Sequence, residues 1–207
     1  MPVAQALADF HASVAQCDSL IANAHQLDPA GQSLLPEIDR QQITVAAFLN
    51  MFIAWETFLE ATLSHLLSGA LTTSGNAPVK FASPPSPEMA KKMVIGTMRY
   101  FDYGNHFNFK KIAEIYFDQG IPFKPPLDAV NASLDDLRVM RNASAHITST
   151  TQTALEALAL RLLAAPSAGI SLYSLLTATD PVSATGGTIF ATYKDILLVT
   201  AGAIASG

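Results

Sequence analysis

Apolar residues recur at spacings of three and four along most of this chain, which is the period of α-helices that bury one face. The clearest run lies at the start of the sequence, and the turn-forming residues Asp28-Pro29-Ala30-Gly31 end it. We therefore predict a first helix with one apolar seam, formed by Val3, Leu7, Phe10, Val14, Cys17, Ile21 and Ala24.

Start and stop signals define the next elements. Residues 36–68 are predicted to form a long second helix that Gly69 ends, and the four prolines in residues 72–87 predict a loop. Ser86 is the expected N-cap of a third helix, because Pro87 occupies the first helical position.

The second half of the chain is also predicted to be helical, and no segment has the alternating pattern of a β-strand. Asn108 is the expected N-cap of a short helix that ends at Gly120. Ser149 and Gln152 resemble a capping box at the start of another helix. The remaining predicted helices cover residues 127–144, 151–164, 171–177 and 188–205.

These elements predict an all-α protein, an up-down helical bundle that residues 1–207 form as a single domain. Residues 71–125 are Pro-rich at first and aromatic afterwards. We expect them to form a helical insertion in the bundle.

Composition narrows the class of protein. Only 14% of the residues are charged, half are hydrophobic and the net charge is −5. Disordered chains and solvated coiled coils carry more charge, and no basic tail is present to coat nucleic acid. The apolar excess indicates a second buried surface besides the core, so we expect a homodimer.

Several absences point to a soluble cytoplasmic protein. Cys17 is the only cysteine, which suits a reducing compartment and excludes an internal disulfide. The N-terminus lacks the pattern of a signal peptide, and the longest apolar stretches fall short of the roughly 20 residues that cross a membrane. The histidines have no metal-ligand spacing, so we expect neither a metal nor a cofactor.

Arg141 interrupts an apolar stripe. Leu127, Val130, Leu134 and Leu137 follow core spacing, and position 141 continues the series. An arginine there reaches solvent or meets a buried anion. His146 follows five residues later, roughly 140° round a straight helix, so the two side chains converge only if the helix ends or bends, or if a second subunit contributes.

Glu56 is a second charge on a core stripe. It shares one face of the long second helix with Leu49, Phe52, Leu63 and Leu67. Because an unpaired buried carboxylate is costly, we predict that Glu56 pairs with Arg141.

These two segments resemble the HEPN domain family. Arg141-Asn142-Ala143-Ser144-Ala145-His146 has the form of the family's R-x(4–6)-H motif, and Ala54-Trp55-Glu56-Thr57-Phe58 is similar to a helix of some bacterial members. The resemblance covers two helices closely and residues 43–164 loosely. It implies a HEPN-like bundle and a metal-independent endoribonuclease of a toxin–antitoxin or phage-defence system.

The resemblance also implies roles for the motif residues and for partners. His146 would transfer protons while the RNA 2′-OH attacks, leaving a 2′,3′-cyclic phosphate, and Arg141 would bind the phosphate. Asn142 would orient either the phosphate or the imidazole of His146, and Glu56 would hold Arg141. The implied partners are RNA, a second subunit, and an antitoxin or a nucleotidyltransferase-like protein.

The middle of the chain is comparatively basic. Residues 80–146 hold nine of the twelve Lys and Arg residues, interleaved with aromatic residues. This pattern is typical of surfaces that bind single-stranded RNA, and it marks Arg99, Tyr103, Lys110 and Lys111 as weaker candidates for substrate contacts. The alternative is that the aromatic residues pack the insertion onto the bundle.

Two other functions also fit the sequence. A non-catalytic HEPN module would bind a nucleotide, RNA or a nucleotidyltransferase partner without cleaving RNA. A purely structural helical dimer would use Glu56 and Arg141 only as a salt bridge, so replacing both by neutral residues would be harmless.

Overall fold

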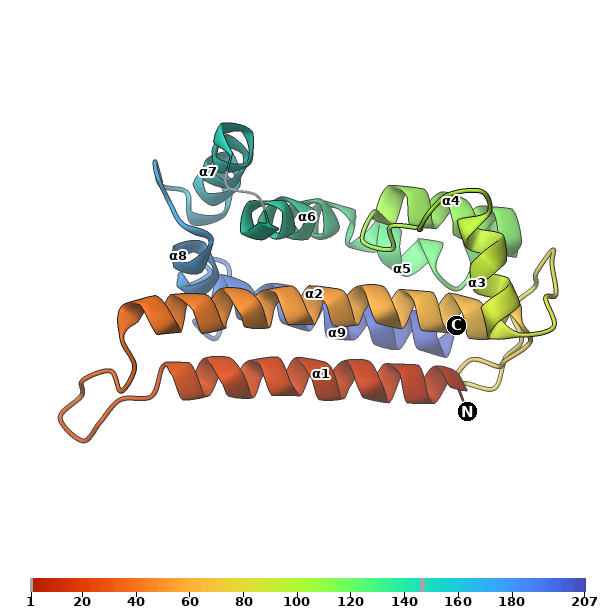
Figure 1. Ribbon diagram of the computed structural model, residues 1–207, viewed down its shortest axis with the longest axis horizontal. Coiled ribbons are helices and arrows are strands. Elements are labelled where there is room, and N and C mark those ends of the chain that lie inside the picture. Colours follow the sequence, from red (N-terminus) through yellow and green to blue (C-terminus); the bar gives the residue numbers. More distant parts are fainter. Residues whose placement is uncertain (1, 146–147) are drawn as a thin grey trace. The chain divides into compact units, whose positions relative to one another are not determined.

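The computed structural model describes residues 2–145 and 148–207. Within these residues every regular element is a helix and none is a strand, which confirms the all-α class (Figure 1). In chain order the helices are α1 (Pro2–Ala24), α2 (Glu37–Leu67), α3 (Pro87–Ile95), α4 (His106–Tyr116), the 3₁₀ turn η1 (Asp118–Gly120), α5 (Lys124–Ala129), α6 (Asn131–Ala145), α7 (Ser149–Leu163), α8 (Leu172–Thr177) and α9 (Ile189–Ser206).

The long helices and the N-cap of α3 match the predicted ones. The bounds of α2, α8 and α9 lie within one residue of prediction, and α1 ends at Ala24, the last residue of its predicted seam and four residues before the predicted stop at Asp28. The Ser86 hydroxyl accepts a hydrogen bond from the Met89 N–H at 3.3 Å, and Pro87 opens α3. The loop prediction between α2 and α3 is confirmed as well.

Three details of the second half differ from prediction. Asn105, and not Asn108, caps α4, because its side chain accepts the Asn108 N–H at 3.2 Å. Thr148 caps α7 in a reciprocal capping box with Thr151, one residue earlier than the predicted pair. The predicted helix over 127–144 is two helices, since Val130 (φ −115°, ψ 20°) interrupts the helical backbone between α5 and α6.

The chain forms two compact units. Unit 1 comprises residues 2–12, 53–134 and 196–207, and unit 2 comprises residues 13–52 and 135–195 apart from 146 and 147. Helices α1, α2, α6 and α9 each contribute residues to both units. The single-domain organisation stays a prediction.

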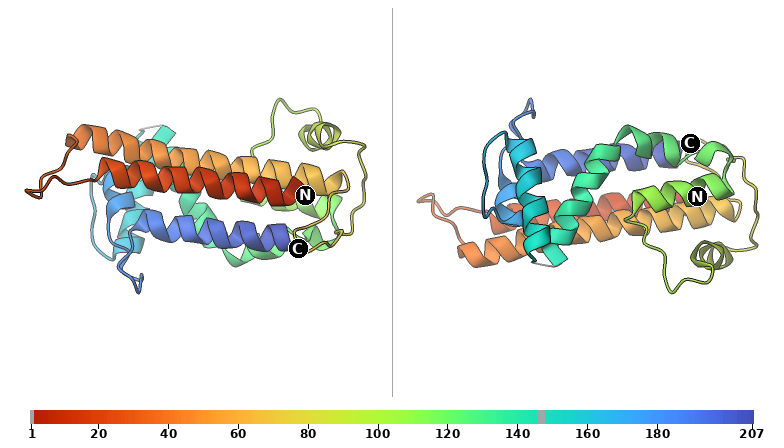
Figure 2. Two further views of the ribbon diagram at one scale, coloured as in Figure 1. Left: turned by 90° about the horizontal axis from the view of Figure 1, so that it is seen from below. Right: turned by 90° about the horizontal axis from the view of Figure 1, so that it is seen from above.

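The core of unit 1 contains two aromatic clusters. Phe10 of α1 packs against Trp55 and Phe58 of α2, with ring centroids 5.9 and 5.6 Å apart, where these helices run side by side in opposite directions (Figures 1 and 2). The second cluster joins α4 to the segment before α5, since Phe123 meets Phe109 and Phe117 edge-on at 5.3 and 5.5 Å. These rings anchor the predicted insertion within unit 1.

The Pro-rich loop between α2 and α3 is held at several points within unit 1. The Thr73 N–H donates to the Ala205 carbonyl at 2.8 Å, and the Phe81 N–H donates to the Tyr116 carbonyl at 2.9 Å. Lys80 donates to the Leu67 carbonyl at 2.6 Å and so binds the C-terminal end of α2. Burial lowers the pKa of Lys80.

Two helices, α2 and α9, are long and apolar enough to cross a membrane when judged by length and composition alone. The best 18-residue window of each has a mean hydropathy of 1.3, and 44% of each window is buried inside the protein. Core helices of soluble proteins meet the same criteria, so the cytoplasmic location stays a prediction.

Candidate functional site

Arg141 and Asn142 lie near the C-terminal end of α6, in unit 2, and both are half-buried. The Arg141 guanidinium donates from Nη1 to Oδ1 of Asn142 at 3.4 Å, and the Ser144 hydroxyl donates to the Arg141 carbonyl at 2.6 Å. Among the described residues of unit 2, no carboxylate forms an ion pair with Arg141. The guanidinium therefore retains donors for an anionic ligand.

His146, the other half of the motif, lies outside the described residues. Helix α6 ends at Ala145 and α7 begins at Ser149 after its cap, Thr148. Whether the helix ends or bends between Arg141 and His146, as convergence of the two side chains requires, stays a prediction. Their mutual distance stays a prediction.

Glu56 is half-buried on α2 and belongs to unit 1. On its predicted stripe Phe52, Leu63 and Leu67 are buried. The predicted pairing of Glu56 with Arg141 joins residues of different units and stays a prediction. One turn further along α2, Glu60 forms an ion pair with Lys91 at 2.7 Å.

A cavity of about 490 Å³ lies directly beside the motif, entirely within unit 2. The end of α6 and the start of α7 contribute Ser144, Thr151 and Gln152 to its wall, and α2 contributes Gln41 and Gln42. The sequence analysis missed this cavity, although its α2 wall has a helical spacing that was visible in the sequence. The apolar part of the lining includes Ile38, Val45, Leu49, Leu155, Ile170 and Leu172.

One wall of this cavity, hereafter the motif cavity, is fixed by hydrogen bonds. Gln152 donates to the Ile170 carbonyl and to Glu156, each at 3.0 Å, and the Gly169 N–H donates to the same Glu156 oxygen at 2.7 Å. These donors lower the pKa of Glu156, because they stabilise its ionised form. The segment after α7 is therefore tied to α7 and forms a defined wall.

A buried polar network holds the first half of α6 in unit 2. Asp136, 8% exposed, accepts hydrogen bonds from the Arg161 guanidinium and, at 2.6 Å, from the Tyr193 hydroxyl. Burial and this bond raise the pKa of Tyr193, and the bond to Asp136 also raises the pKa of Arg161. The sequence analysis missed this Asp136 network, because no local pattern links residues so far apart.

The four weaker candidates of the insertion are placed very differently. Lys110 is largely buried and donates to Asp128 at 2.7 Å and to Asn131 at 2.8 Å, so it serves the internal structure. Tyr103 is 8% exposed and meets Phe101 edge-on at 4.9 Å, and burial raises its pKa. Arg99 and Lys111 are exposed.

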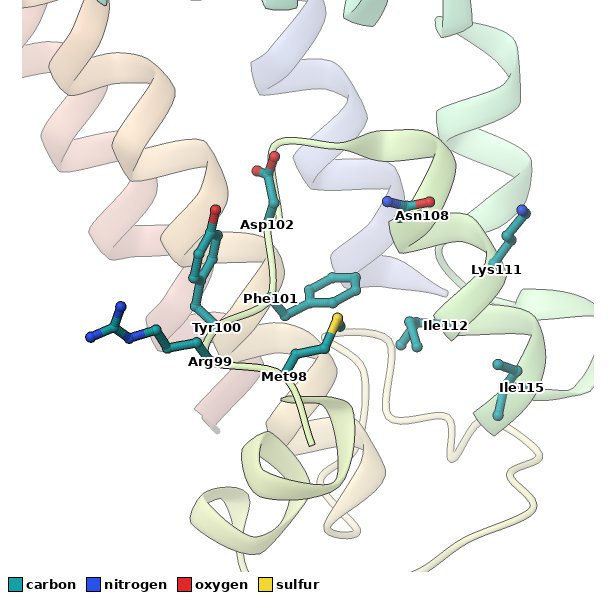
Figure 3. Close-up of a pocket in the computed structure, with 9 residues that line it drawn as sticks. All are labelled: Met98, Arg99, Tyr100, Phe101, Asp102, Asn108, Lys111, Ile112 and Ile115. Carbon is teal, nitrogen blue, oxygen red and sulfur yellow. The ribbon is translucent and has the colours of Figure 1, made fainter. Parts of the chain in front are cut away.

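A second cavity, of about 620 Å³, lies beside the two exposed cations, within unit 1 (Figure 3). It lies between the segment after α3 and one side of α4. Its lining residues are Met98, Arg99, Tyr100, Phe101, Asp102, Asn108, Lys111, Ile112 and Ile115.

No described group of three or more His, Cys, Asp or Glu side chains is arranged to hold a metal ion. Comparison with known proteins gives no match to a protein-family model, a curated protein or a solved structure. Function is therefore argued from the arrangement of the side chains.

Proposed function

We propose that the protein is a metal-independent endoribonuclease of HEPN type with Arg141 and His146 as its catalytic residues. The observation that carries the proposal is the half-buried Arg141, which has no carboxylate partner among the described residues of unit 2. A half-buried cation in that state favours an anionic ligand, and a phosphate group matches the bidentate geometry of a guanidinium.

The chemistry requires few protein groups, since RNA supplies its own nucleophile. His146 removes the proton of the 2′-OH as the oxygen attacks the adjacent phosphorus, or protonates the departing 5′-oxygen. Arg141 stabilises the charge that develops on the phosphate oxygens. The products are a 2′,3′-cyclic phosphate and a 5′-hydroxyl group.

Two further residues position the catalytic pair in this mechanism. Asn142 accepts a hydrogen bond from Arg141 and so restricts the orientation of the guanidinium. For Glu56 the resemblance to the family implies a positioning role as well. The motif cavity, with Ser144, Thr151 and Gln152 in its wall, receives the nucleotide next to the cleaved bond.

The active form in this proposal is a cytoplasmic homodimer with two facing motifs, acting as a toxin or phage-defence nuclease. Exposed apolar side chains of unit 2 offer contact area for a second subunit, and Leu27, Leu34, Ile38 and Leu160 are each more than half exposed. An antitoxin or a nucleotidyltransferase-like protein is the expected regulatory partner.

RNA cleavage in the presence of EDTA tests the proposal. The wild type should cleave RNA to products with 2′,3′-cyclic phosphate ends, and a 2′-deoxy substitution at the cleaved position should stop the reaction. Arg141→Ala and His146→Ala should each remove nearly all activity. Arg138→Ala is the matched control, because Arg138 is an exposed arginine on the same helix and forms an ion pair with Asp135 at 3.7 Å.

Three results would overturn the catalytic role: no cleavage by the wild type, full cleavage by the two motif variants, or equal loss in Arg138→Ala. Expression in a bacterial host adds an independent measurement. Growth arrest by the wild type that disappears in His146→Ala, but persists in a variant of the exposed His11, supports a nuclease.

A further inference from the structure

The cavity of unit 1 beside α4, hereafter the insertion cavity, combines apolar and cationic surfaces (Figure 3). Met98 and Phe101 lie at its centre, and Ile112 and Ile115 of α4 close one side. The Arg99 and Lys111 side chains extend away from the centre on opposite sides. Its volume of about 620 Å³ falls within the roughly 300–1,000 Å³ that is usual for small-ligand pockets.

The two cations of this cavity differ from three other lysines of the same unit. Lys91, Lys110 and Lys124 each form an ion pair with a nearby carboxylate. Among the described residues, no carboxylate forms an ion pair with Arg99 or Lys111, and Lys111 lies 4.2 Å from the centroid of the Phe107 ring. Both positive charges are therefore available to an external anion.

Two apolar side chains of the cavity are exposed, although neighbouring rings are buried and hold the segment in place. The buried rings Phe101, Tyr103 and Phe109 form a continuous set of contacts that fixes the segment before α4. Tyr100, in contrast, is 72% exposed and Met98 is 55% exposed. An exposed aromatic ring in a cavity with two cations that lack an ion pair is a combination that binds a base and its flanking phosphates in single-stranded nucleic acids.

We propose that the insertion cavity binds one unpaired nucleotide of single-stranded RNA. The base stacks on Tyr100 and contacts Met98 and Phe101, while Arg99 and Lys111 contact the phosphates on its two sides. Asn108 and Asp102 face the polar edge of the base, since an amide and a carboxylate together accept and donate hydrogen bonds there. Taking RNA as the ligand rests on the proposed function.

The geometry excludes a paired base from this site. In an A-form duplex both faces of each base are covered by its neighbours, so only an unstacked nucleotide offers a face to Tyr100. The site would therefore direct the nuclease to loops, bulges and unpaired ends. Lys110 and Tyr103, which serve the internal structure, have no part in this contact.

Binding of a fully 2′-O-methylated RNA oligonucleotide tests this site separately from catalysis, because such RNA has no nucleophile. Fluorescence anisotropy should show that Arg99→Ala/Lys111→Ala raises the Kd about 10- to 100-fold and lowers its dependence on salt by roughly 0.7 per lost phosphate contact. Tyr100→Ala should raise the Kd about 5- to 100-fold. A hairpin stem of equal length should bind more weakly than the single strand.

The matched control is Lys92→Ala/Arg138→Ala, which removes two exposed cations elsewhere and should leave the Kd within about twofold. A wild-type Kd in Arg99→Ala/Lys111→Ala or in Tyr100→Ala would overturn the site, as would equal binding of stem and single strand. A change of sedimentation by Tyr100→Ala at unchanged Kd would also overturn it and would indicate a subunit contact. Oligonucleotide binding without cleavage of ordinary RNA would keep this site and remove the catalytic proposal.

Discussion

Two arginines of unit 2 have opposite surroundings. Arg161 donates to Asp136, a buried carboxylate that is also bound by Tyr193, so its charge is neutralised within the protein. Arg141, five residues after Asp136 on the same helix, donates to a neutral amide at 3.4 Å. The difference separates a charge that holds helices together from a charge that remains available to a ligand.

The prediction with the largest expected effect tests whether Arg141 is available to a ligand. Arg141→Ala should lower kcat for RNA cleavage about 100- to 1,000-fold, because the developing phosphate charge loses its main stabilising group. The thermal midpoint should stay close to that of the wild type, since no ion pair within unit 2 is lost. A large fall of the thermal midpoint would show that Arg141 stabilises the fold as Arg161 does, and would contradict its assignment as a charge available to a ligand.

Asp136→Ala should have the next largest effect, on stability. Removing the carboxylate leaves the buried Tyr193 hydroxyl without its acceptor and frees the half-exposed Arg161, at a cost of about 2 kcal/mol in the free energy of unfolding. Urea denaturation measures this change. Asp195→Ala is the matched control, because Asp195 is an exposed acid on α9, and it should change stability by less than about 0.5 kcal/mol.

Tyr193→Phe removes one hydrogen bond of the Asp136 network and so separates the contribution of Tyr193 from that of Arg161. Asp136 keeps its bond to Arg161, so the free energy of unfolding should fall by about 1 kcal/mol. Tyr100→Phe, at an exposed ring, should leave stability unchanged. A loss for Tyr193→Phe as large as that of Asp136→Ala would mean that Arg161 contributes nothing to the network.

The smallest expected effect concerns pH. Burial lowers the pKa of His25, and Arg40 adds to the shift, so the unfolded chain binds the proton more tightly. This contribution to stability is complete above the ordinary pKa of 6.5 and is lost as the pH falls through it towards the lowered value. His25→Gln, which can keep the contact with Thr44, should reduce the loss of thermal midpoint between pH 7.5 and 5.5. An unchanged pH dependence, or the same effect from exposed His11→Gln, would contradict this.

Local signals account for what could be predicted from the sequence. The period of the apolar residues defines α1 and α2, and the Ser86-Pro87 pair defines the start of α3, because each depends on neighbours within a few positions. The break at Val130 could not be predicted in this way, since the apolar spacing continues from Leu127 to Leu134 across it.

The site was only partly predictable for the same reason. Arg141 stood out because it continues an apolar stripe, and its half-buried position agrees with that interpretation. Asp136 lies beside that stripe, and its partners come from α7 and α9, so no short motif reveals the network. The insertion cavity depends on how the segment after α3 lies against α4, which no helical period encodes.

The anchored Pro-rich loop between α2 and α3 has a consequence for amide hydrogen exchange. The N–H groups of the loop residues Thr73 and Phe81 are bonded to carbonyls far away in the sequence, and the Asp118 N–H of η1 donates to the Val79 carbonyl of the loop at 3.0 Å. Their exchange with deuterium requires local opening, so they should exchange far more slowly than the amide of Asn76, whose acceptor is a side chain four residues away. A segment without regular secondary structure would then share the protection of the helices that it joins.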